Sequence, residues 1–443
     1  MNTILLLIFF ISICLFDYFF FKKSIISTPF IFSFPFILAL CDGLIYYKQW
    51  QFNLSSKTVL LIIFGTISVT IGSALVFFNQ RVEIKDSVYL KRFVFKRSVY
   101  IFFAILVFLS TIITVFFEKK LVASYGYPSG SLSEIIGSYN EMSKFGATDI
   151  SLQGIGAYAY EITFSVGLLF AYLLAREIAI MHLDFSRECC FVYILSTFCV
   201  LTVGSRSVSI TLVLAFVFLL LFFLQYTGQF RGIGLVKVKT ILLMFVGLCF
   251  IPIIFLQSLS LIGRDSGSSN STVLYDFSIY LGAPLKNMDI VISKGVNNSS
   301  TFFAENTFAI LYQTLQKFGF QVPQHPVTSD FGFQSIGGWF LGNVYTIFTT
   351  LYEDFGFLGC CLALFLMGLS MQLLQSICLK KINSDKISVT TIMYGYFSYN
   401  VFFSFFADMT FQTFFSTVFL KKLFFNLIFC FILNKIVRIK TYE

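Results

Sequence analysis

The chain has 443 residues, of which 57% are hydrophobic and 12% charged, and its mean hydropathy is +0.84. This composition excludes a soluble globular domain, because a soluble core cannot absorb so many apolar residues. The net charge of +9 comes from Lys and Arg residues that gather in short connections between apolar runs. That pattern follows the positive-inside rule and is not a nucleic-acid-binding face, so we expect an integral membrane protein that binds no nucleic acid.

Apolar runs near or above the roughly 18 residues that cross a bilayer recur along the chain. The first run follows Met1 without a basic leader and reaches Lys22 without a small-residue cleavage site, so we expect an uncleaved anchor. The stretch 189–225 divides at Arg206, because an arginine in mid-bilayer costs several kcal/mol and a tight turn there costs less. Eleven spans are expected, within a range of ten to twelve. They lie at 3–21, 27–46, 57–78, 99–117, 156–175, 189–204, 207–225, 239–257, 355–378, 387–406 and 411–437.

Four basic connections fall on the same side of the membrane when the spans are counted. They are 79–98, 176–188, 226–238 and 380–386. The positive-inside rule makes this side cytoplasmic, which places the N-terminus outside and the C-terminus inside. The far side then holds the connection 118–155, the turn at Arg206 and the long polar segment 258–354.

We predict an all-α polytopic transmembrane bundle with a large, partly helical periplasmic loop. In chain order, residues 1–257 form an N-terminal bundle of about eight spans, 258–354 form the loop, and 355–443 form the C-terminal spans. Apolar residues recur at helical spacing within 308–318, which predicts an amphipathic helix on the membrane or over the bundle. The segment 131–145 has similar mixed polarity and is also expected at the interface.

Two arginines, Arg206 and Arg264, stand at the far-side ends of expected spans, against the usual bias of Arg toward the cytoplasm. Each lies among small residues that leave the guanidinium accessible. A guanidinium binds phosphate bidentately, so both are candidate anion ligands. Snorkelling to lipid headgroups, or pairing of Arg264 with Asp265, is the structural alternative.

Titratable residues supply further candidates. His325 lies between prolines in the long loop, which present it rigidly. It acts either as a general base or as a donor to the leaving phosphate, or it is a surface histidine without a role. Glu353 and Asp354 precede the expected span 355–378, where they could act as a base or simply favour a helix N-terminus. Glu161 lies inside an apolar run near the far-side end of its span, where an ionisable group is expensive and indicates a proton or ion path.

Tyr345 and Tyr352 form with these acids a polar, aromatic mouth of the kind that holds sugars. No DxD pair for a metal and no nucleotide-binding glycine fingerprint occur in the sequence. Almost all of the ten cysteines lie in or beside apolar runs, and they include no CxxC spacing. A lipid-linked sugar donor therefore fits better than a nucleotide sugar, and we expect no metal and no cofactor.

The segments GNVYT (342–346) and LYEDFGFLG (351–359) resemble a recurring stretch of bacterial O-antigen polymerases, also called oligosaccharide repeat-unit polymerases. The layout is similar as well, with eleven or twelve spans, a Gly-Ser-Arg turn in mid-chain and one large periplasmic loop in the second half. The resemblance covers the chain as an architecture and only this short stretch as a motif.

This resemblance implies a GT-C-like membrane glycosyltransferase of lipopolysaccharide biosynthesis, in the bacterial inner membrane with its active site facing the periplasm. Such an enzyme transfers the growing glycan from polyprenyl diphosphate to an incoming lipid-linked unit and needs no cofactor. The expected partners are undecaprenyl-diphosphate-linked oligosaccharide, membrane lipids and a chain-length-determining membrane protein.

Within this resemblance we assign Arg206 and Arg264 to the diphosphate, because fixed cations neutralise the charge that develops on the leaving group. The catalytic candidates are His325, Glu353 and Asp354, and the sugar-binding candidates are Asn343, Tyr345 and Tyr352.

The chain departs from related enzymes in two places. Neither Arg206 nor Arg264 has a glycine eleven positions on, so the paired RX10G motifs often described for the family are absent and the arginine roles rest on position. The connection 47–56 contains no acid of the kind that binds metal in related dolichol-dependent enzymes, which predicts metal independence.

Two other functions stay open. An O-antigen ligase shares the architecture but passes the glycan to lipid A core, and the stretch 343–359 favours the polymerase. A flippase or transporter would carry lipid-linked units without chemistry and would need charges lining a central cavity. The polar residues here gather instead in one exoplasmic loop.

Overall fold

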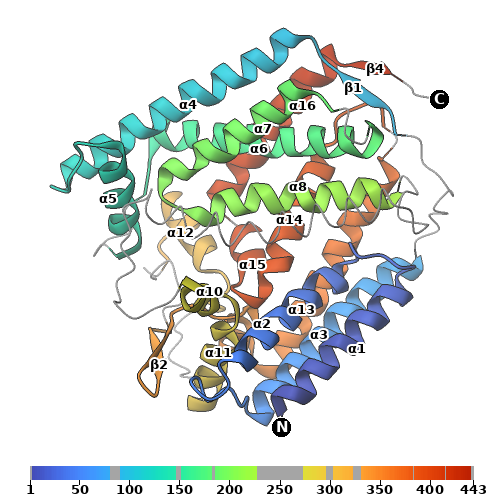
Figure 1. Cartoon of the computed structure of the whole chain (residues 1–443), viewed down its shortest axis with the longest axis vertical. Helices are drawn as coiled ribbons and strands as arrows, with labels where there is room; N and C mark the ends of the chain where they lie inside the picture. Colours follow the sequence, from blue (N-terminus) through green and yellow to red (C-terminus); the bar gives the residue numbers. More distant parts are fainter. Residues whose placement is uncertain are drawn as a thin grey trace. The chain divides into compact units, whose positions relative to one another are not determined.

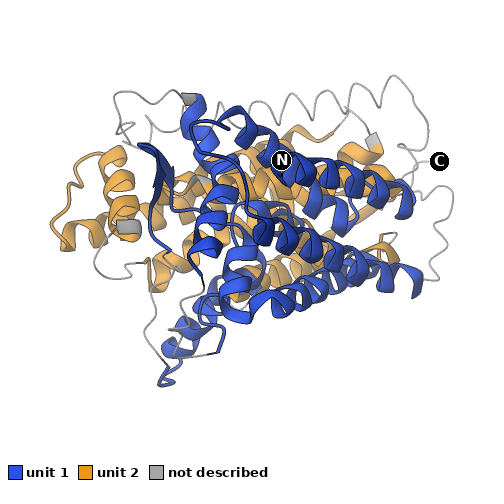
Figure 2. Ribbon diagram, turned by 90° about the horizontal axis from the view of Figure 1, so that it is seen from below, with its two compact units in different colours: residues 1–82, 271–377, 397–419 blue, residues 83–270, 378–396, 420–443 orange. Residues whose placement is uncertain are grey.

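The described part of the chain, in a computed structural model, is mostly helical with two small antiparallel pairs of strands (Figure 1). The structure describes residues 2–79, 90–145, 151–181, 185–226, 273–295, 303–322, 331–382, 384–414 and 416–440. Two compact units are each built from segments far apart in the sequence (Figure 2). Unit 1 comprises residues 1–82, 271–377 and 397–419, and unit 2 comprises 83–270, 378–396 and 420–443.

Unit 1 contains α1, α2 and α3, which pack against one another beside the N-terminus (Figure 1). Its core is aromatic: Phe10 stacks on Phe36 with ring centroids 5.1 Å apart, and Phe348 meets Phe36 edge-on at 5.7 Å. Its elements are α1 (Asn2–Phe20), α2 (Thr28–Ile45), α3 (Ser56–Asn79), α10 (Val273–Leu281), α11 (Ala283–Lys294), α12 (Ala309–Lys317), β2 (Gln334–Ile336), β3 (Trp339–Gly342), most of α13 (Ile347–Lys380), η3 (Phe403–Phe405) and α15 (Met409–Phe414).

Unit 2 is organised around α6, whose most apolar window is 89% buried and which packs against α4, α7 and α8. The corresponding window of α4 is only 22% buried, as expected for a helix that presents apolar side chains to lipid. Its elements are β1 (Arg92–Val94), α4 (Arg97–Ser124), α5 (Leu132–Phe145), α6 (Gly154–Met181), α7 (Arg187–Cys199), η1 (Val200–Val203), α8 (Arg206–Tyr226), α14 (Val389–Phe402, which ends in unit 1), most of α16 (Thr417–Ile436) and β4 (Arg438–Lys440).

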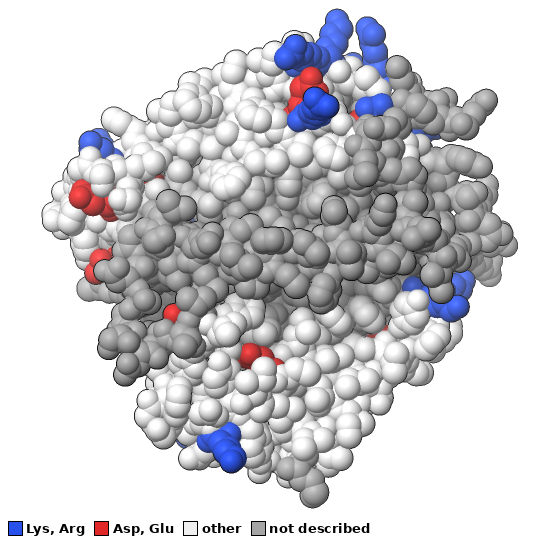
Figure 3. Space-filling model, in the orientation of Figure 1, with Lys and Arg blue, Asp and Glu red and all other residues white. Residues whose placement is uncertain are grey.

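Three basic connections meet at one end of unit 2. Strand β1 pairs with β4, so that Phe93 lies opposite Ile439. The Arg176 guanidinium donates to the carbonyl of Lys91 at 3.0 Å and to that of Ile382 at 3.1 Å. Figure 3 shows Lys and Arg gathered over the start of α4 and these strands. The described parts of these connections in unit 2, which include 90–98, 176–181 and 380–382, thus share one end, as the span count requires.

Eight helices among the described residues are long and apolar enough to cross a membrane. They are α1, α2, α3, α4, α6, α8, α13 and α16. This confirms an all-α membrane protein. Two further expected spans correspond to α7 and α14, which have 13 and 14 residues, and the expected span 239–257 lies outside the described residues. The count of eleven therefore stays a prediction.

The expected turn at Gly204 is present. Helix α7 continues through η1 to Gly204, which adopts a left-handed φ of 69°, and α8 begins at Arg206. A Cβ at this glycine would lie 2.7 Å from Cβ of Asn140 on α5. Only glycine combines this backbone conformation with so close a neighbour, so the turn also fixes where α5 packs.

Two spans begin elsewhere than expected. Helix α13 starts at Ile347, well before 355, and Gly356 (φ 65°, ψ −166°) divides it into a short helix and a long one. The expected span 411–437 is two helices, because Asp408 and Ser416 each cap a helix start. Asp408 Oδ1 accepts from the amide of Phe411 at 3.1 Å, and Ser416 Oγ accepts from that of Phe419 at 2.9 Å. The expected helix in 308–318 is confirmed as α12, and the segment of mixed polarity at 131–145 forms α5.

Candidate active site

The chain start, the connection 46–55 and part of the long loop meet at one end of unit 1. The Thr3 hydroxyl donates to the carbonyl of Phe52 at 3.0 Å. Asp289 of α11 accepts from the amide of Ser55 at 2.8 Å, from the Thr58 hydroxyl at 2.9 Å and from Lys286 Nζ at 3.1 Å. This polar end of unit 1 thus joins segments that an odd number of spans places on the far side.

The residues of the GNVYT segment are held where the loop enters α13. Asn287 Nδ2 donates to the carbonyls of Leu341 and Val344, both at 3.0 Å. The buried Tyr345 hydroxyl accepts from Gln334 Nε2 at 2.9 Å and lies 2.6 Å from the carbonyl oxygen of Gly332. The Tyr345 hydroxyl is therefore engaged in hydrogen bonds at the hairpin of β2 and β3. A sugar could contact Tyr345 only through the aromatic ring.

Asn343 and Tyr352, the other sugar-binding candidates, differ in exposure. Asn343 is exposed beside the hairpin, where a sugar could reach its amide. Tyr352 is only 7% exposed, and Lys57 Nζ lies 5.1 Å from its ring centroid. The ring is thus already covered by a cation–π contact, and the sugar-binding assignments stay predictions.

Asp354 holds a separate segment of the long loop. Its Oδ1 accepts from the amide of Asn306 at 3.2 Å and from Asn306 Nδ2 at 2.8 Å, and its Oδ2 accepts from the amide of Thr307 at 2.6 Å. The sequence suggested that Asp354 favours the N-terminus of the helix that follows it. The amides that it accepts from belong instead to the turn before α12. Both oxygens thus hold this turn, and the catalytic role of Asp354 stays a prediction.

Glu353 has the opposite surroundings to its neighbour. Its side chain is half-buried, and Oε1 is buried without a hydrogen-bond partner. Lys57, at the start of α3, is close enough to interact with it electrostatically. A carboxylate oxygen with spare accepting capacity beside a cation can take a proton from a hydroxyl group, which is what a general base must do.

Asp408 is an acid that sequence reasoning missed. It is 2% exposed in the turn between η3 and α15, and its Oδ2 is buried without a hydrogen-bond partner. Burial raises the pKa of Asp408 to about 7, and the negative charge of Asp354 contributes. The available signal was a lone acid in the four-residue gap between the expected spans 387–406 and 411–437.

The structure describes no side chain for the three remaining predicted site residues. His325 and Arg264 fall outside the described residues, and Arg206 is described only as the backbone position that begins α8. The diphosphate assignment and the role of His325 therefore stay predictions. Lys57 is an exposed cation that the structure adds beside the acids.

A second polar cluster lies within unit 2. Glu161 Oε2 is 4.0 Å from Lys422 Nζ, and that ammonium also lies 4.0 Å from the centroid of the Phe164 ring. Both charged side chains are buried, and Glu118 on α4 is fully buried without a hydrogen-bond partner. The proton or ion path at Glu161 stays a prediction.

Within the described ranges, no group of three or more His, Cys, Asp and Glu side chains is arranged to hold a metal ion. Comparisons with protein-family models, with curated proteins and with solved structures found no match to this chain.

Proposed function

We propose that this protein is a membrane glycosyltransferase of the O-antigen polymerase type, which polymerises lipid-linked oligosaccharide repeat units at the periplasmic face of the bacterial inner membrane. The observation that supports this most is the unpartnered Oε1 of Glu353 beside Lys57, at the polar end of unit 1. Glu353 belongs to the segment that resembles these polymerases, and its neighbour Asp354 holds a turn of the long loop.

In the proposed reaction, a hydroxyl of the incoming unit attacks the anomeric carbon of the growing glycan. The bond from that carbon to the oxygen of polyprenyl diphosphate breaks, and the diphosphate leaves with the electron pair. Glu353 takes the hydroxyl proton as the bond forms. Lys57 neutralises the charge that develops on the leaving group, a role that the sequence also predicts for Arg206 and Arg264. Asp354 keeps the turn at Asn306 in place and so positions the loop.

The test is a lipopolysaccharide gel from the source strain with the gene deleted and then restored. For the polymerase we expect the ladder to collapse to core plus a single repeat on deletion. Restoration with Glu353→Gln should leave it collapsed, with a loss of at least about a hundredfold in long chains. Glu141→Gln, which changes an exposed acid on α5, should restore the ladder. Protein amount in the membrane is measured alongside.

Other outcomes of this gel separate the alternatives. Loss of every glycan-bearing band identifies a ligase or a flippase. Without either of these proteins, not even a single repeat unit is attached to the lipid A core. An unchanged ladder on deletion contradicts any role in this glycan. If restoration with Glu353→Gln gives normal long chains, the protein can still be a polymerase, but Glu353 is not its base.

One observation favours the transporter alternative. The buried pair Glu161–Lys422 and the unpartnered Glu118 are charged or titratable groups at membrane depth, where such groups commonly mark a path for ions or polar solutes. Purified protein in vesicles that moves a lipid-linked oligosaccharide across the bilayer, and that loses this activity with Glu161→Gln, would support transport. No movement would exclude it.

A further inference from the structure

Exposed aromatic rings gather on the hairpin of β2 and β3, which packs beside α10 and α11 in unit 1 (Figure 1). Phe333 is 57% exposed, Trp339 is 42% exposed and Phe340 is 49% exposed. Residues 331–342, which contain the hairpin, include no charged side chain. The proposed active site uses none of these three rings, so the proposed function does not explain why they are exposed.

The exposed rings lie on both faces of the hairpin. Neighbouring residues of a strand point to opposite faces, so Trp339 and Phe340 cannot share one. Trp339 pairs across the strands with Ile336, while Phe340 pairs with Ser335 and stacks on Phe333 with ring centroids 5.6 Å apart. An antiparallel pair at the surface of a soluble protein commonly turns a polar face to water. Each face of this hairpin exposes an aromatic ring instead.

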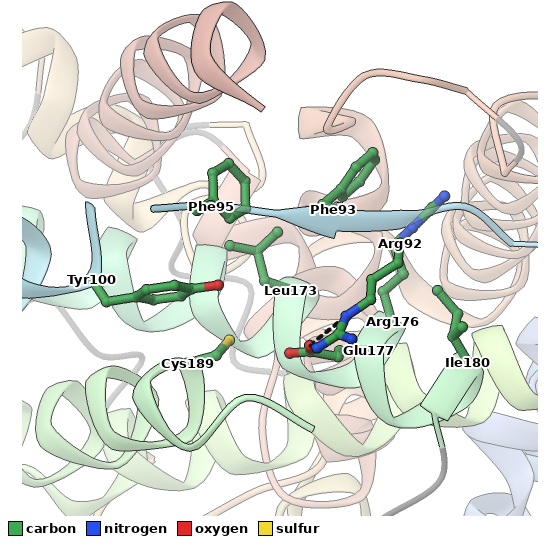
Figure 4. Close-up of a pocket in the computed structure, with 9 residues that line it drawn as sticks. All are labelled: Arg92, Phe93, Phe95, Tyr100, Leu173, Arg176, Glu177, Ile180 and Cys189. Carbon is green, nitrogen blue, oxygen red and sulfur yellow. Dashed lines mark hydrogen bonds and ion pairs between the residues drawn. The ribbon is translucent and has the colours of Figure 1, made fainter. Parts of the chain in front are cut away.

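The pair of β1 and β4 in unit 2 has the opposite chemistry. Its strands contain Arg92, Arg438 and Lys440, and Arg92 Nε donates to Glu177 Oε1 at 2.9 Å (Figure 4). Charged side chains of this kind suit strands that lie in water at a membrane surface. The lack of any charge in β2 and β3 favours surroundings that are less polar than water.

Ring contacts tie the hairpin to the end of a helix that is long and apolar enough to cross the membrane. Helix α2 ends at Ile45, and the ring centroid of the next residue, Tyr46, lies 5.5 Å from that of Tyr275 on α10. The Tyr275 ring lies 5.3 Å from the Trp339 ring, and the Tyr275 hydroxyl donates to the carbonyl of Phe340 at 2.7 Å. Because a spanning helix ends at a membrane surface, Trp339 lies close to the depth of that surface.

The apolar surface continues from the hairpin onto the helices beside it. Leu274 of α10 is 72% exposed, and Ile45 at the end of α2 is 73% exposed. Trp and Phe rings favour the boundary between lipid and water, where Trp can also keep its N–H wet. We propose that the hairpin of β2 and β3 inserts into the membrane–water interface beside the end of α2, so that lipid surrounds Phe333, Trp339 and Phe340.

The backbone of the hairpin limits how deep it can lie. The outer edge of a two-stranded hairpin leaves N–H and C=O groups unpaired, and the hydrocarbon core does not tolerate such groups. The interface supplies water and headgroups that can pair with them. The hairpin therefore lies at the level of the headgroups and the first part of the acyl chains. This proposal rests on α2 crossing the membrane and does not depend on the polymerase activity.

The test uses the fluorescence of the two tryptophans of the chain. Trp50 is fully buried, and Trp50→Phe leaves Trp339 as the single tryptophan. The full-length protein is reconstituted in phosphatidylcholine vesicles whose acyl chains carry bromine near the headgroup, bromine near the chain end or no bromine. Bromine quenches only a ring that it can approach closely, so Trp339 should lose most emission with bromine near the headgroup. If Trp50→Phe does not fold, the difference between the unaltered protein and Trp339→Phe gives the same signal.

Three other outcomes overturn the proposal. Stronger quenching by bromine at the chain end places the Trp339 ring in the hydrocarbon core. Quenching by acrylamide in the water, without quenching by brominated lipid, places the hairpin in water, where a glycan could stack on its rings. Quenching by neither shows that protein, such as a second copy of this chain, covers the ring.

A matched pair of variants, made in the Trp50→Phe protein, tests the second face of the hairpin. Phe340→Asp places a charge on the hairpin, where contact with lipid makes it costly. The quenching of Trp339 by brominated lipid should therefore fall, and its emission should shift to longer wavelength. Phe320→Asp changes an exposed ring of the long loop outside the hairpin, and it should alter neither. If Phe340→Asp also alters neither, the face with Phe340 does not enter lipid and the proposal fails.

Discussion

Glu353 and Asp354 are adjacent in sequence, yet their carboxylates have different surroundings. Asp354 accepts three hydrogen bonds from Asn306 and Thr307, while Oε1 of Glu353 accepts none. Neighbouring positions on a helix point about 100° apart, so one side chain reaches the loop turn and the other reaches Lys57. Under the proposed function, this difference assigns the base to Glu353 and the positioning role to Asp354, a choice that the sequence left undecided.

Asp408 makes stability depend on pH at the residue scale. The unfolded carboxyl titrates near its ordinary value of 3.8, while burial raises the folded pKa to about 7. Because the folded state holds a proton that the unfolded state releases, stability should fall as pH rises from about 4 through about 7. Asp408→Asn keeps the cap oxygen for Phe411 and removes the titration. Its Tm should match that of the unaltered protein near pH 4 and exceed it near pH 8. Parallel curves would contradict the raised pKa.

At the scale of elements, the break in α13 sets the place of Glu353. Gly356 has φ 65° and ψ −166°, a conformation that only glycine adopts without strain, and nothing lies within 4 Å of a Cβ added there. The cost of Gly356→Ala therefore comes from the backbone and not from a clash.

We expect Gly356→Ala to reduce the free energy of unfolding by about 1–3 kcal/mol, the usual cost of such a conformation. Relief of the strain by straightening α13 would turn Glu353 away from Lys57, so glycan chains should shorten as well. Ser370→Ala on the same helix serves as control for thermal unfolding and for the ladder. If Gly356→Ala leaves both Tm and glycan chain length unchanged, the break in α13 affects neither stability nor polymerisation.

At the scale of the whole molecule, sidedness can be measured directly. An odd number of spans puts Asn53 and Asn343 outside and Arg438 inside. Cysteine introduced at each position should react with a membrane-impermeant maleimide in spheroplasts at the first two and only after permeabilisation at the third. The parent chain, with its ten cysteines, gives the background. Labelling of Arg438→Cys from outside would contradict the count of eleven.

The sequence by itself determined the class of the protein, most of its helices and the turn at Gly204. These follow from local signals, because hydropathy over a window of residues and the backbone freedom of glycine do not depend on what packs nearby. The same signals missed the break at Gly356 and the cap at Ser416, since a short interruption inside an apolar run is averaged away.

Only the tertiary structure decided what each polar side chain does. Asp354 holds a turn that lies 48 positions earlier at Asn306, and Lys422 of α16 pairs with Glu161 of α6. Among the described residues, the neighbours of the Arg176 guanidinium at one end of unit 2 are carbonyls and rings. The charge and hydrogen-bond partners of a buried group depend on contacts between distant segments, and no local pattern in the sequence contains them.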